Sequence, residues 1–96
     1  MIFRWDPRKA AINRLKHGVD FFEANTVLAD PLSTTFPDPK HSYAESRYVT
    51  IGTSAKRRLL VVVHTEGFDE IRIISARGAT PRERRFYEEG GPDEER

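Results

Sequence analysis

The sequence predicts an α+β fold, in which two N-terminal helices and one C-terminal helix pack on a small antiparallel sheet. Three observations lead to this fold class. Helix-start signals lie at Asp6 and Asp20, before any long apolar run. Three runs rich in β-branched residues follow between residues 47 and 77, separated by short polar turns. Another helix-start signal, at Thr80, comes after the last of these runs.

The N-terminus is expected to form a short strand over residues 2–5, followed directly by a helix. Asp6 is a favourable N-cap, and Pro7 suits the first helical position because an N–H there has no partner within the helix. The helix should continue to about Lys16 and end at Gly18. Its buried stripe is expected to consist of three apolar residues, Ala11, Ile12 and Leu15.

A second helix is expected from the capping signal Asp20-x-x-Glu23 to a point before Pro31. One side of it is apolar, with Phe21, Ala24 and Leu28 in line and Phe22 and Val27 nearby. Residues 30–46 contain three prolines and form the least regular part of the chain. Within them, a short edge strand is expected over residues 32–36.

Three strands are predicted next, over residues 47–53, 59–65 and 70–77. The turns between them, residues 54–57 and 66–69, are short enough for hairpins. If both hairpins are symmetric about these turns, one face carries Arg47, Val49, Ile51, Leu60, Val62, His64, Ile71, Ile73, Ser75 and Arg77. The other face then carries Tyr48, Thr50, Gly52, Leu59, Val61, Val63, Arg72, Ile74 and Ala76.

The first of these faces is the more apolar and is expected to pack on the helices. The second carries polar and small side chains and resembles an open surface. A one-residue bulge would exchange the two sets of residues. The pattern therefore leaves open which arginines meet in one site.

The last helix is expected to begin at Thr80, with Pro81 at the first helical position and Glu83 in the position of a capping-box acid. The glycines and proline of residues 90–92 should end it. We therefore expect one domain over residues 1–89 and an acidic, disordered tail over residues 90–96.

Composition limits the class of protein. Ninety-six residues are enough for one domain with a modest core. The chain has no cysteine, which excludes disulfides and thiolate metal sites. No apolar run is long enough to span a membrane, and the N-terminus does not read as a signal peptide, so a cytoplasmic protein is expected.

The formal net charge of +1 conceals an asymmetry. Residues 88–96 hold five acids and one base, which leaves residues 1–87 with 15 bases and 10 acids. A body with this basic excess could bind RNA or an acidic protein partner. By composition alone, the simpler interpretation is a solvated surface of mixed charge.

Metal and nucleophile chemistry lack a sequence signature. None of the three histidines has the spacing of a metal site, and we expect no metal and no cofactor. There is no catalytic-serine motif and no glycine-rich phosphate loop.

Metal-free RNA cleavage requires less, because the ribose 2′-hydroxyl is itself the nucleophile. The protein supplies a base, an acid and cations that stabilise the charge developing on phosphorus. The residues that could move protons are His41, Glu45, His64 and Tyr87. The arginines that could bind phosphate are Arg47, Arg72, Arg77 and Arg82. A basic turn, Lys56, Arg57 and Arg58, could hold flanking RNA.

Each of these residues also has a structural interpretation. His64 is more simply explained as a half-buried strand histidine bonded to a carbonyl, and Glu83 is most simply the capping-box acid. Glu45 and Arg47 could form a local ion pair, and a basic hairpin turn is often only a soluble one. Arg77 is the hardest to explain this way, because an arginine that ends a buried strand needs a defined partner, for which Glu83 is one candidate.

The chain resembles the BrnT family of toxins over nearly its whole length to about Glu89. The segments that carry the resemblance occur in family order: Phe3-Arg4-Trp5-Asp6-Pro7-x-Lys9, Asn13-x-x-Lys16-His17-Gly18-Val19-x-Phe21, Asp30-Pro31, Asp38-x-x-His41-Ser42, Glu45-x-Arg47, Ile51-Gly52, Arg72-Ile73-Ile74-Ser75-Ala76-Arg77 and Ala79-x-x-x-Glu83-Arg84-x-x-Tyr87. Only the Gly-Gly-Pro acidic tail lies outside the pattern.

The resemblance implies a toxin of a type II toxin–antitoxin pair with a RelE-like fold. Such a toxin is expected to be a metal-independent endoribonuclease that cleaves RNA and inhibits translation. Its implied partner is a BrnA-type antitoxin, a ribbon-helix-helix DNA-binding dimer. The antitoxin would neutralise the toxin and connect it to operator DNA.

The resemblance also directs the choice of site residues. We expect Arg47 and Arg77 to stabilise phosphate and transition state, Glu45 to act as the base, and His41 or Tyr87 as the acid. His64 is a less favoured alternative. The residues expected to hold RNA are Lys56, Arg57, Arg58, Arg72 and Arg82.

Two other functions remain open at this point. The chain could be a non-catalytic binding module that serves as co-repressor subunit of an antitoxin–operator complex. It could also be a toxin of the same fold that acts on gyrase rather than RNA. Convergence of Glu45, Arg47 and Arg77 in an open concave site would favour catalysis, and internal ion pairs for all three would favour binding.

Overall fold

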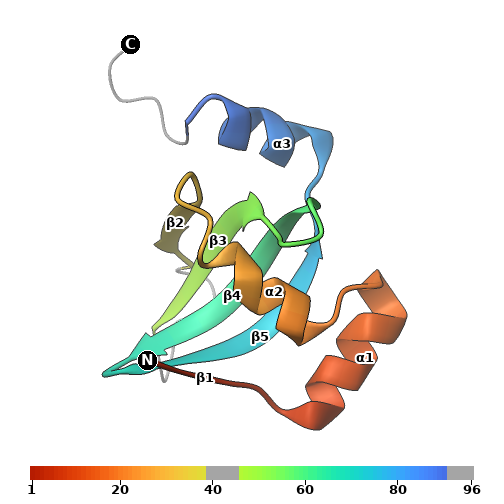
Figure 1. The fold of residues 1–96 in the computed structure, drawn as a ribbon, viewed down its shortest axis with the longest axis vertical. Helices are drawn as coiled ribbons and strands as arrows, with labels where there is room; N and C mark the ends of the chain where they lie inside the picture. Colours follow the sequence, from red (N-terminus) through yellow and green to blue (C-terminus); the bar gives the residue numbers. More distant parts are fainter. Residues whose placement is uncertain (39–45, 91–96) are drawn as a thin grey trace.

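A computed structural model describes residues 1–38 and 46–90. The protein has an α+β fold with a five-stranded mixed sheet and three helices (Figure 1). In chain order the elements are β1 (Ile2–Arg4), α1 (Pro7–His17), α2 (Phe21–Val27), β2 (Thr34–Pro37), β3 (Arg47–Thr53), β4 (Leu59–Gly67), β5 (Glu70–Gly78) and α3 (Pro81–Glu88). No helix in the described part of the chain combines the length and the hydropathy needed to span a lipid bilayer.

The helix-start signals are confirmed. The Asp6 carboxylate accepts a hydrogen bond from the backbone N–H of Arg8 at 2.8 Å, and the Asp20 carboxylate accepts one from that of Glu23 at 2.7 Å. At the end of α1, Gly18 takes a left-handed conformation with φ 70°, which glycine adopts without steric cost. Local chemistry alone therefore determines where these helices begin and where α1 ends.

The prediction of a purely antiparallel sheet is wrong. The strand order is β1-β5-β4-β3-β2, and β1 pairs parallel to β5, with Ile2 opposite Glu70 and Arg4 opposite Arg72. The other three pairs are antiparallel. The parallel pair joins the two ends of the domain, and no turn signal in the sequence announces such a long-range contact.

The predicted division of the strands into two faces is also wrong, for two local reasons. The β3–β4 turn has five residues instead of four, and Arg57 within it has φ 63°, so Thr53 pairs with Leu59. The β4–β5 ladder shifts register between Val63 and His64. Each change moves side chains by one residue and so exchanges their faces.

The corrected faces pack on different helices. One face packs on α2 and on Val19, which precedes it, in a buried cluster against which Ala10 of α1 also packs. The cluster consists of Val19, Phe21, Ala24, Val27, Leu60, Val62, Ile73 and Ala76. On the opposite face, α3 covers one end of the sheet, where Phe86 and Tyr87 pack against a cluster that consists of Ile51, Leu59 and Val61. Arg47 and Arg77 therefore lie on the side of α3 and not, as expected, on the side of α1 and α2.

The predicted apolar stripe of α1 is wrong as well. Ile12 is 61% exposed and Leu15 is 89% exposed, whereas the polar Asn13 is buried. The Asn13 amide donates to the carbonyl of Ala76 at 2.8 Å, and its oxygen accepts from the N–H of Ala76 at 3.1 Å. β1 pairs only with the first part of β5, so Ala76 lies where that edge of β5 has no neighbouring strand. The Asn13 side chain takes the place of a strand there and satisfies the backbone groups of Ala76. In this region α1 therefore packs through Asn13 rather than through an apolar stripe.

Candidate functional site

A row of basic residues crosses the sheet on the face that α3 partly covers. In the strand register, Arg47 of β3 lies opposite Thr65 of β4, Thr65 opposite Arg72 of β5, and Arg72 opposite Arg4 of β1. Neighbouring strands are about 4.8 Å apart, so the Cα atoms of Arg47 and Arg72 are separated by about 10 Å. Long arginine side chains at that spacing can reach a common anionic ligand. We call Arg4, Arg47, Thr65 and Arg72 the arginine row.

Arg77 lies on the same face, opposite Val61 of β4. Val61 and Thr65 are four positions apart along β4, which places Arg77 about 13 Å along the sheet from the arginine row. Its guanidinium binds Glu83 through two hydrogen bonds, from Nη1 at 2.8 Å and from Nη2 at 2.9 Å. Nη1 also donates to the carbonyl oxygen of Gly78 at 3.1 Å. The Arg77 side chain remains 42% exposed.

Glu83 orients Arg77 from the first turn of α3. Its carboxylate also accepts the N–H of Thr80 at 2.9 Å, and the Thr80 hydroxyl accepts the N–H of Glu83, so the predicted capping box is present. The hydrogen bonds from Arg77 lower the pKa of Glu83 to about 2. The pair is therefore ionised at neutral pH and connects the end of β5 to the start of α3.

Tyr87 occupies a different position from the arginines. Its hydroxyl donates to the carboxylate of Asp30 at 2.6 Å and accepts from the hydroxyl of Thr53 at 3.2 Å. The same Asp30 oxygen accepts the backbone N–H of Thr53 at 2.8 Å. The bond to Asp30 raises the pKa of Tyr87. The tyrosine thus connects α3 to the segment after α2 through Asp30, a contact that the sequence pattern did not predict.

Tyr87→Phe is expected to lower the free energy of unfolding by about 1–2 kcal/mol, because Asp30 loses a short hydrogen bond in a partly buried position. Urea unfolding measures this loss. Tyr48→Phe is the matched control, because the Tyr48 hydroxyl makes no hydrogen bond to the described residues, and it should change stability by less than about 0.5 kcal/mol. An equal effect of both substitutions would contradict the structural role of Tyr87.

His64 is fully buried on the face that packs on α1 and α2. Its Nε2 lies 2.7 Å from the hydroxyl of Thr50, and that hydroxyl lies 2.7 Å from the hydroxyl of Thr35. Burial lowers the pKa of His64, which favours the neutral ring at pH 7. His64 therefore belongs to a polar chain across three strands, on the opposite face of the sheet from the arginines.

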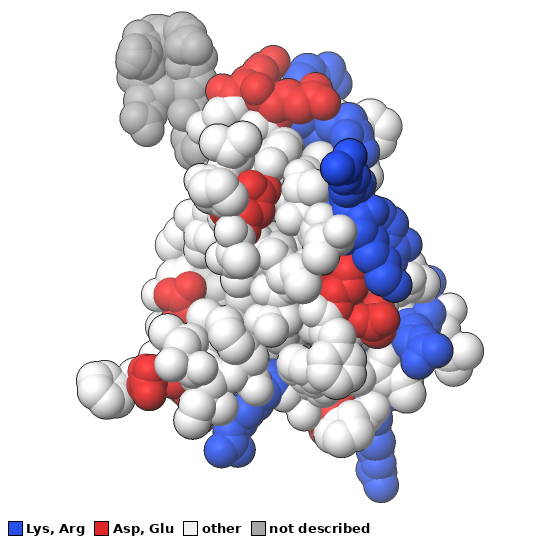
Figure 2. All heavy atoms as spheres, viewed as in Figure 1, with Lys and Arg blue, Asp and Glu red and all other residues white. Residues whose placement is uncertain are grey.

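The basic turn is divided between two environments. Lys56 and Arg57 are exposed. Arg58 instead binds the carboxylate of Glu23, a residue whose side chain is only 2% exposed, through both Nε and Nη2. Nη2 also donates to the carbonyl of Gly18 at 3.1 Å. Figure 2 shows basic side chains gathered on the right of the molecule, near the β3–β4 turn and the start of α3.

The remaining predicted residues lie apart or outside the described residues. Arg82 is exposed on α3 and lines a shallow hollow with Arg85, Phe86 and Glu89. His41 and Glu45, the expected acid and base, fall within residues 39–45, which are not described. Among the described residues, no three histidines or carboxylates gather as metal ligands would.

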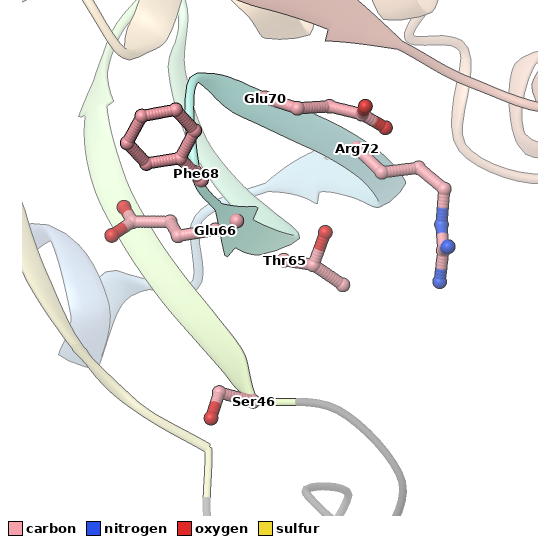
Figure 3. A pocket seen from close by; sticks show the side chains of 7 residues that line it. Ser46, Thr65, Glu66, Phe68, Glu70 and Arg72 are labelled. Atoms are coloured by element: carbon pink, nitrogen blue, oxygen red, sulfur yellow. The ribbon is translucent and has the colours of Figure 1, made fainter.

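A cavity of about 300 Å³ lies beside the arginine row, at the tip of the β4–β5 hairpin (Figure 3). The residues that line it are Ser46, Thr65, Glu66, Gly67, Phe68, Glu70 and Arg72. Of these, only Arg72 is among the site residues predicted from the sequence. The exposure of Phe68 could have been predicted from the sequence. Phe68 lies in the predicted hairpin turn of residues 66–69, and a large aromatic side chain in so short a turn has little chance of being buried.

Comparison with known proteins supports the sequence resemblance. Residues 5–83 match the family model described as ribonuclease toxin, BrnT, of type II toxin–antitoxin system. The fold is similar to the 1.1 Å crystal structure of the Brucella abortus ribonuclease toxin BrnT, with a TM-score of 0.65 and 26% sequence identity. That match covers 83% of this chain and 99% of the Brucella chain. Among curated proteins, none matches.

Proposed function

The chain belongs to the BrnT family of ribonuclease toxins of type II toxin–antitoxin systems, and on this basis we propose that it is a metal-independent endoribonuclease. In this proposal it cleaves RNA in the cytoplasm and inhibits translation, as the resemblance to RelE-like toxins implies. A type II toxin has an antitoxin partner. We propose that this partner is of the BrnA type, a ribbon-helix-helix dimer that connects the toxin to operator DNA.

The observation that carries the proposal is the placement of Arg47, Arg72 and Arg77 on one face of the sheet. Arginine binds phosphate through paired N–H groups, and such donors stabilise the charge that develops on phosphorus during cleavage. The 2′-hydroxyl of the substrate supplies the nucleophile, so the protein needs no nucleophile of its own. The geometry therefore suits phosphodiester cleavage on a sheet surface.

Arg77 can bind phosphate while it is held by Glu83. Of its five N–H groups, three are used in the bonds to Gly78 and Glu83. The Nε–H and one N–H of Nη2 remain, and these two donors point in parallel along one edge of the guanidinium, as a phosphate requires. Glu83 would then act as a positioning residue, because it holds the guanidinium in one orientation.

The remaining roles are assigned by the same proposal. Glu45 is the proposed base, and His41 is preferred over Tyr87 as the acid because the Tyr87 proton is engaged by Asp30. Lys56, Arg57 and Arg82 are exposed and are proposed to hold flanking RNA. Arg58 contributes to the same turn chiefly through its structural pair with Glu23.

A non-catalytic co-repressor is the alternative function, and one observation favours it. Arg77 lies in an internal ion pair with Glu83, which is the arrangement expected if the residue serves only structure. The alternative predicts that Arg77 is needed for stability and for antitoxin binding but that the protein cleaves no RNA.

The deciding experiment is cleavage of RNA by purified, antitoxin-free protein in EDTA. The wild type should cleave and leave 2′,3′-cyclic phosphate ends. Arg77→Ala should reduce kcat by about 100-fold or more, as loss of a transition-state donor does. Arg14→Ala, an exposed arginine on α1, is the matched control and should keep full activity.

Glu83→Gln separates catalysis from structure in this experiment. The glutamine oxygen still accepts a hydrogen bond from Arg77, so the arginine stays while the ion pair is lost. A folded Glu83→Gln variant that cleaves far better than Arg77→Ala supports a direct role of the guanidinium. If the wild type cleaves neither naked RNA nor mRNA on ribosomes, the ribonuclease proposal is wrong, and a co-repressor or a toxin that acts on gyrase remains.

A further inference from the structure

The tip of the β4–β5 hairpin presents an aromatic ring with no structural partner among the described residues. Phe68 is fully exposed, and it stands beside Asp69, which holds the turn with φ 61°. Exposed aromatic rings are the platforms on which proteins stack single-stranded nucleobases. Phe68 also lines the 300 Å³ cavity beside the arginine row, so a stacked base would have polar groups within reach.

The three acids around the tip differ in what they contact. Asp69 lies 3.2 Å from the N-terminal amine, and the Glu70 carboxylate lies 3.5 Å from Nε of Arg4. Among the described residues, the basic group recorded within 4 Å of the Glu66 carboxylate is the buried His64, at 3.9 Å. Burial lowers the pKa of that histidine, so it is neutral at pH 7. Glu66 is therefore the acid of the tip whose acceptors are most available.

The cavity extends from Glu66 and Phe68 to Arg72, which belongs to the arginine row. Figure 3 shows the Phe68 ring and the Glu66 carboxylate on one side of the hairpin end and the Arg72 guanidinium on the other, with Thr65 between them. A base on the first side would leave its ribose and phosphate directed toward Arg72. The volume of about 300 Å³ is at the lower end of the range for small-molecule sites and is enough for one nucleobase.

We propose that this cavity is a subsite for a guanine base of single-stranded RNA, with Phe68 stacking on the ring and Glu66 accepting hydrogen bonds from its Watson–Crick edge. The inference rests on the proposed ribonuclease function and adds to it a base preference near the cleaved bond. Arg72 holds the adjoining phosphate, and Thr65 and Ser46 are hydroxyl-bearing residues that line the cavity.

The Glu66 carboxylate favours guanine over the other three bases because of the hydrogen bonds it can accept. An ionised carboxylate only accepts hydrogen bonds, through two oxygens side by side. Guanine presents two adjacent donors, N1–H and the N2 amine, which match this pair. Adenine and cytosine present one amine next to a ring nitrogen that repels the carboxylate. Uracil presents a single N–H between two carbonyl oxygens, which repel it as well.

Equilibrium binding of fluorescein-labelled, 2′-O-methyl pentanucleotides tests the proposal, because blocking the 2′-hydroxyl prevents cleavage. The probes are four uridines with guanine, inosine or adenine in the central position, measured at fixed salt. The wild type should bind the guanine probe about tenfold or more tightly than the adenine probe. Inosine keeps N1–H but lacks the N2 amine and should fall between them.

Two substitutions should have different signatures. Glu66→Gln should abolish the preference for guanine, because the glutamine amide places a donor against a donor. Glu70→Gln is the matched control in the same cavity and should keep the preference, since Glu70 contacts Arg4. Phe68→Ala should weaken binding of all probes by about tenfold, because stacking tolerates any base, and Phe68→Trp should restore it.

The outcomes separate this inference from the ribonuclease proposal. Cleavage without a guanine preference, or a preference that survives Glu66→Gln, overturns the subsite and leaves the ribonuclease intact. Guanine-selective binding by a protein that cleaves nothing supports the subsite and overturns the ribonuclease. If Phe68→Ala leaves RNA binding unchanged and weakens antitoxin binding instead, the ring belongs to a protein interface and the subsite is wrong.

Discussion

Arg58→Ala is expected to lower the free energy of unfolding by about 2–3 kcal/mol, because it leaves a buried carboxylate without its charged donor, while the 45% exposure of the Arg58 side chain lets solvent screen part of the interaction. The Glu23 carboxylate is 2% exposed and is held by Arg58 and by the hydroxyl of Ser54, which donates at 2.6 Å. Without the guanidinium, a buried carboxylate keeps one hydroxyl donor and no cation. A single domain is typically stable by only about 5–15 kcal/mol, so a loss of this size is a sizeable part of the total.

Urea unfolding of Arg58→Ala beside Lys56→Ala measures this effect. Lys56 is an exposed cation of the same turn and should change stability by less than about 0.5 kcal/mol. If Arg58→Ala is as mild as Lys56→Ala, the ion pair between Arg58 and Glu23 does not stabilise the protein. Adding Glu23→Leu to Arg58→Ala should restore part of the loss, because no charge then remains buried.

The pH dependence of this effect has a defined sign. The hydrogen bond from Arg58 is the main cause that lowers the pKa of Glu23 below the ordinary value of a glutamate side chain. A group with a lowered pKa stabilises the fold fully above its unfolded value and loses that contribution as pH falls through the folded value. The difference between the wild type and Arg58→Ala should therefore be largest near neutral pH and should shrink in acid.

Asn13→Ala is expected to cost about 3 kcal/mol, because it removes three hydrogen bonds and leaves buried backbone groups without partners. The Asn13 amide donates to the carbonyl oxygens of Val19 at 3.0 Å and of Ala76 at 2.8 Å, and its oxygen accepts the N–H of Ala76. Ala76 is completely buried, so water does not replace these contacts. Asn13→Asp should also destabilise, because a carboxylate cannot donate to either carbonyl.

The matched control for Asn13 is Leu15→Ala on the same helix. Leu15 is 89% exposed, and its truncation should cost less than about 0.5 kcal/mol. Thermal or urea unfolding compares the two variants. A larger loss for Leu15→Ala than for Asn13→Ala would show that α1 packs through its apolar residues, as the sequence pattern suggested, and would contradict the packing described above.

Local signals predicted the elements well. The capping residues Asp6, Asp20 and Thr80 begin the three helices as expected, and the third strand of the chain runs from Arg47 to Thr53 as predicted. These features depend on hydrogen bonds and backbone conformations within a few residues, which a sequence displays directly. The family could be recognised for a related reason, because its motifs are short segments in a fixed order and can be read directly from the sequence.

Site geometry was predicted less well, because it depends on register. One residue with positive φ, Arg57, and one shift beside His64 exchanged the faces of the strands. As a result Arg47 and Arg77 moved to the side of α3, and His64 became part of a buried polar chain on the other side. Period-2 alternation cannot detect such a shift, since both registers leave an alternating pattern.

The sequence by itself determined the element types, the helix ends, the absence of thiol chemistry and the family. Only the tertiary structure decided that β1 runs parallel beside β5, that Asn13 rather than Leu15 anchors α1, and that Arg58 is held by Glu23. These contacts join residues tens of positions apart, and their energies depend on which groups lose water together. Local sequence records what each residue prefers, whereas burial and partnership arise only when the whole chain has packed.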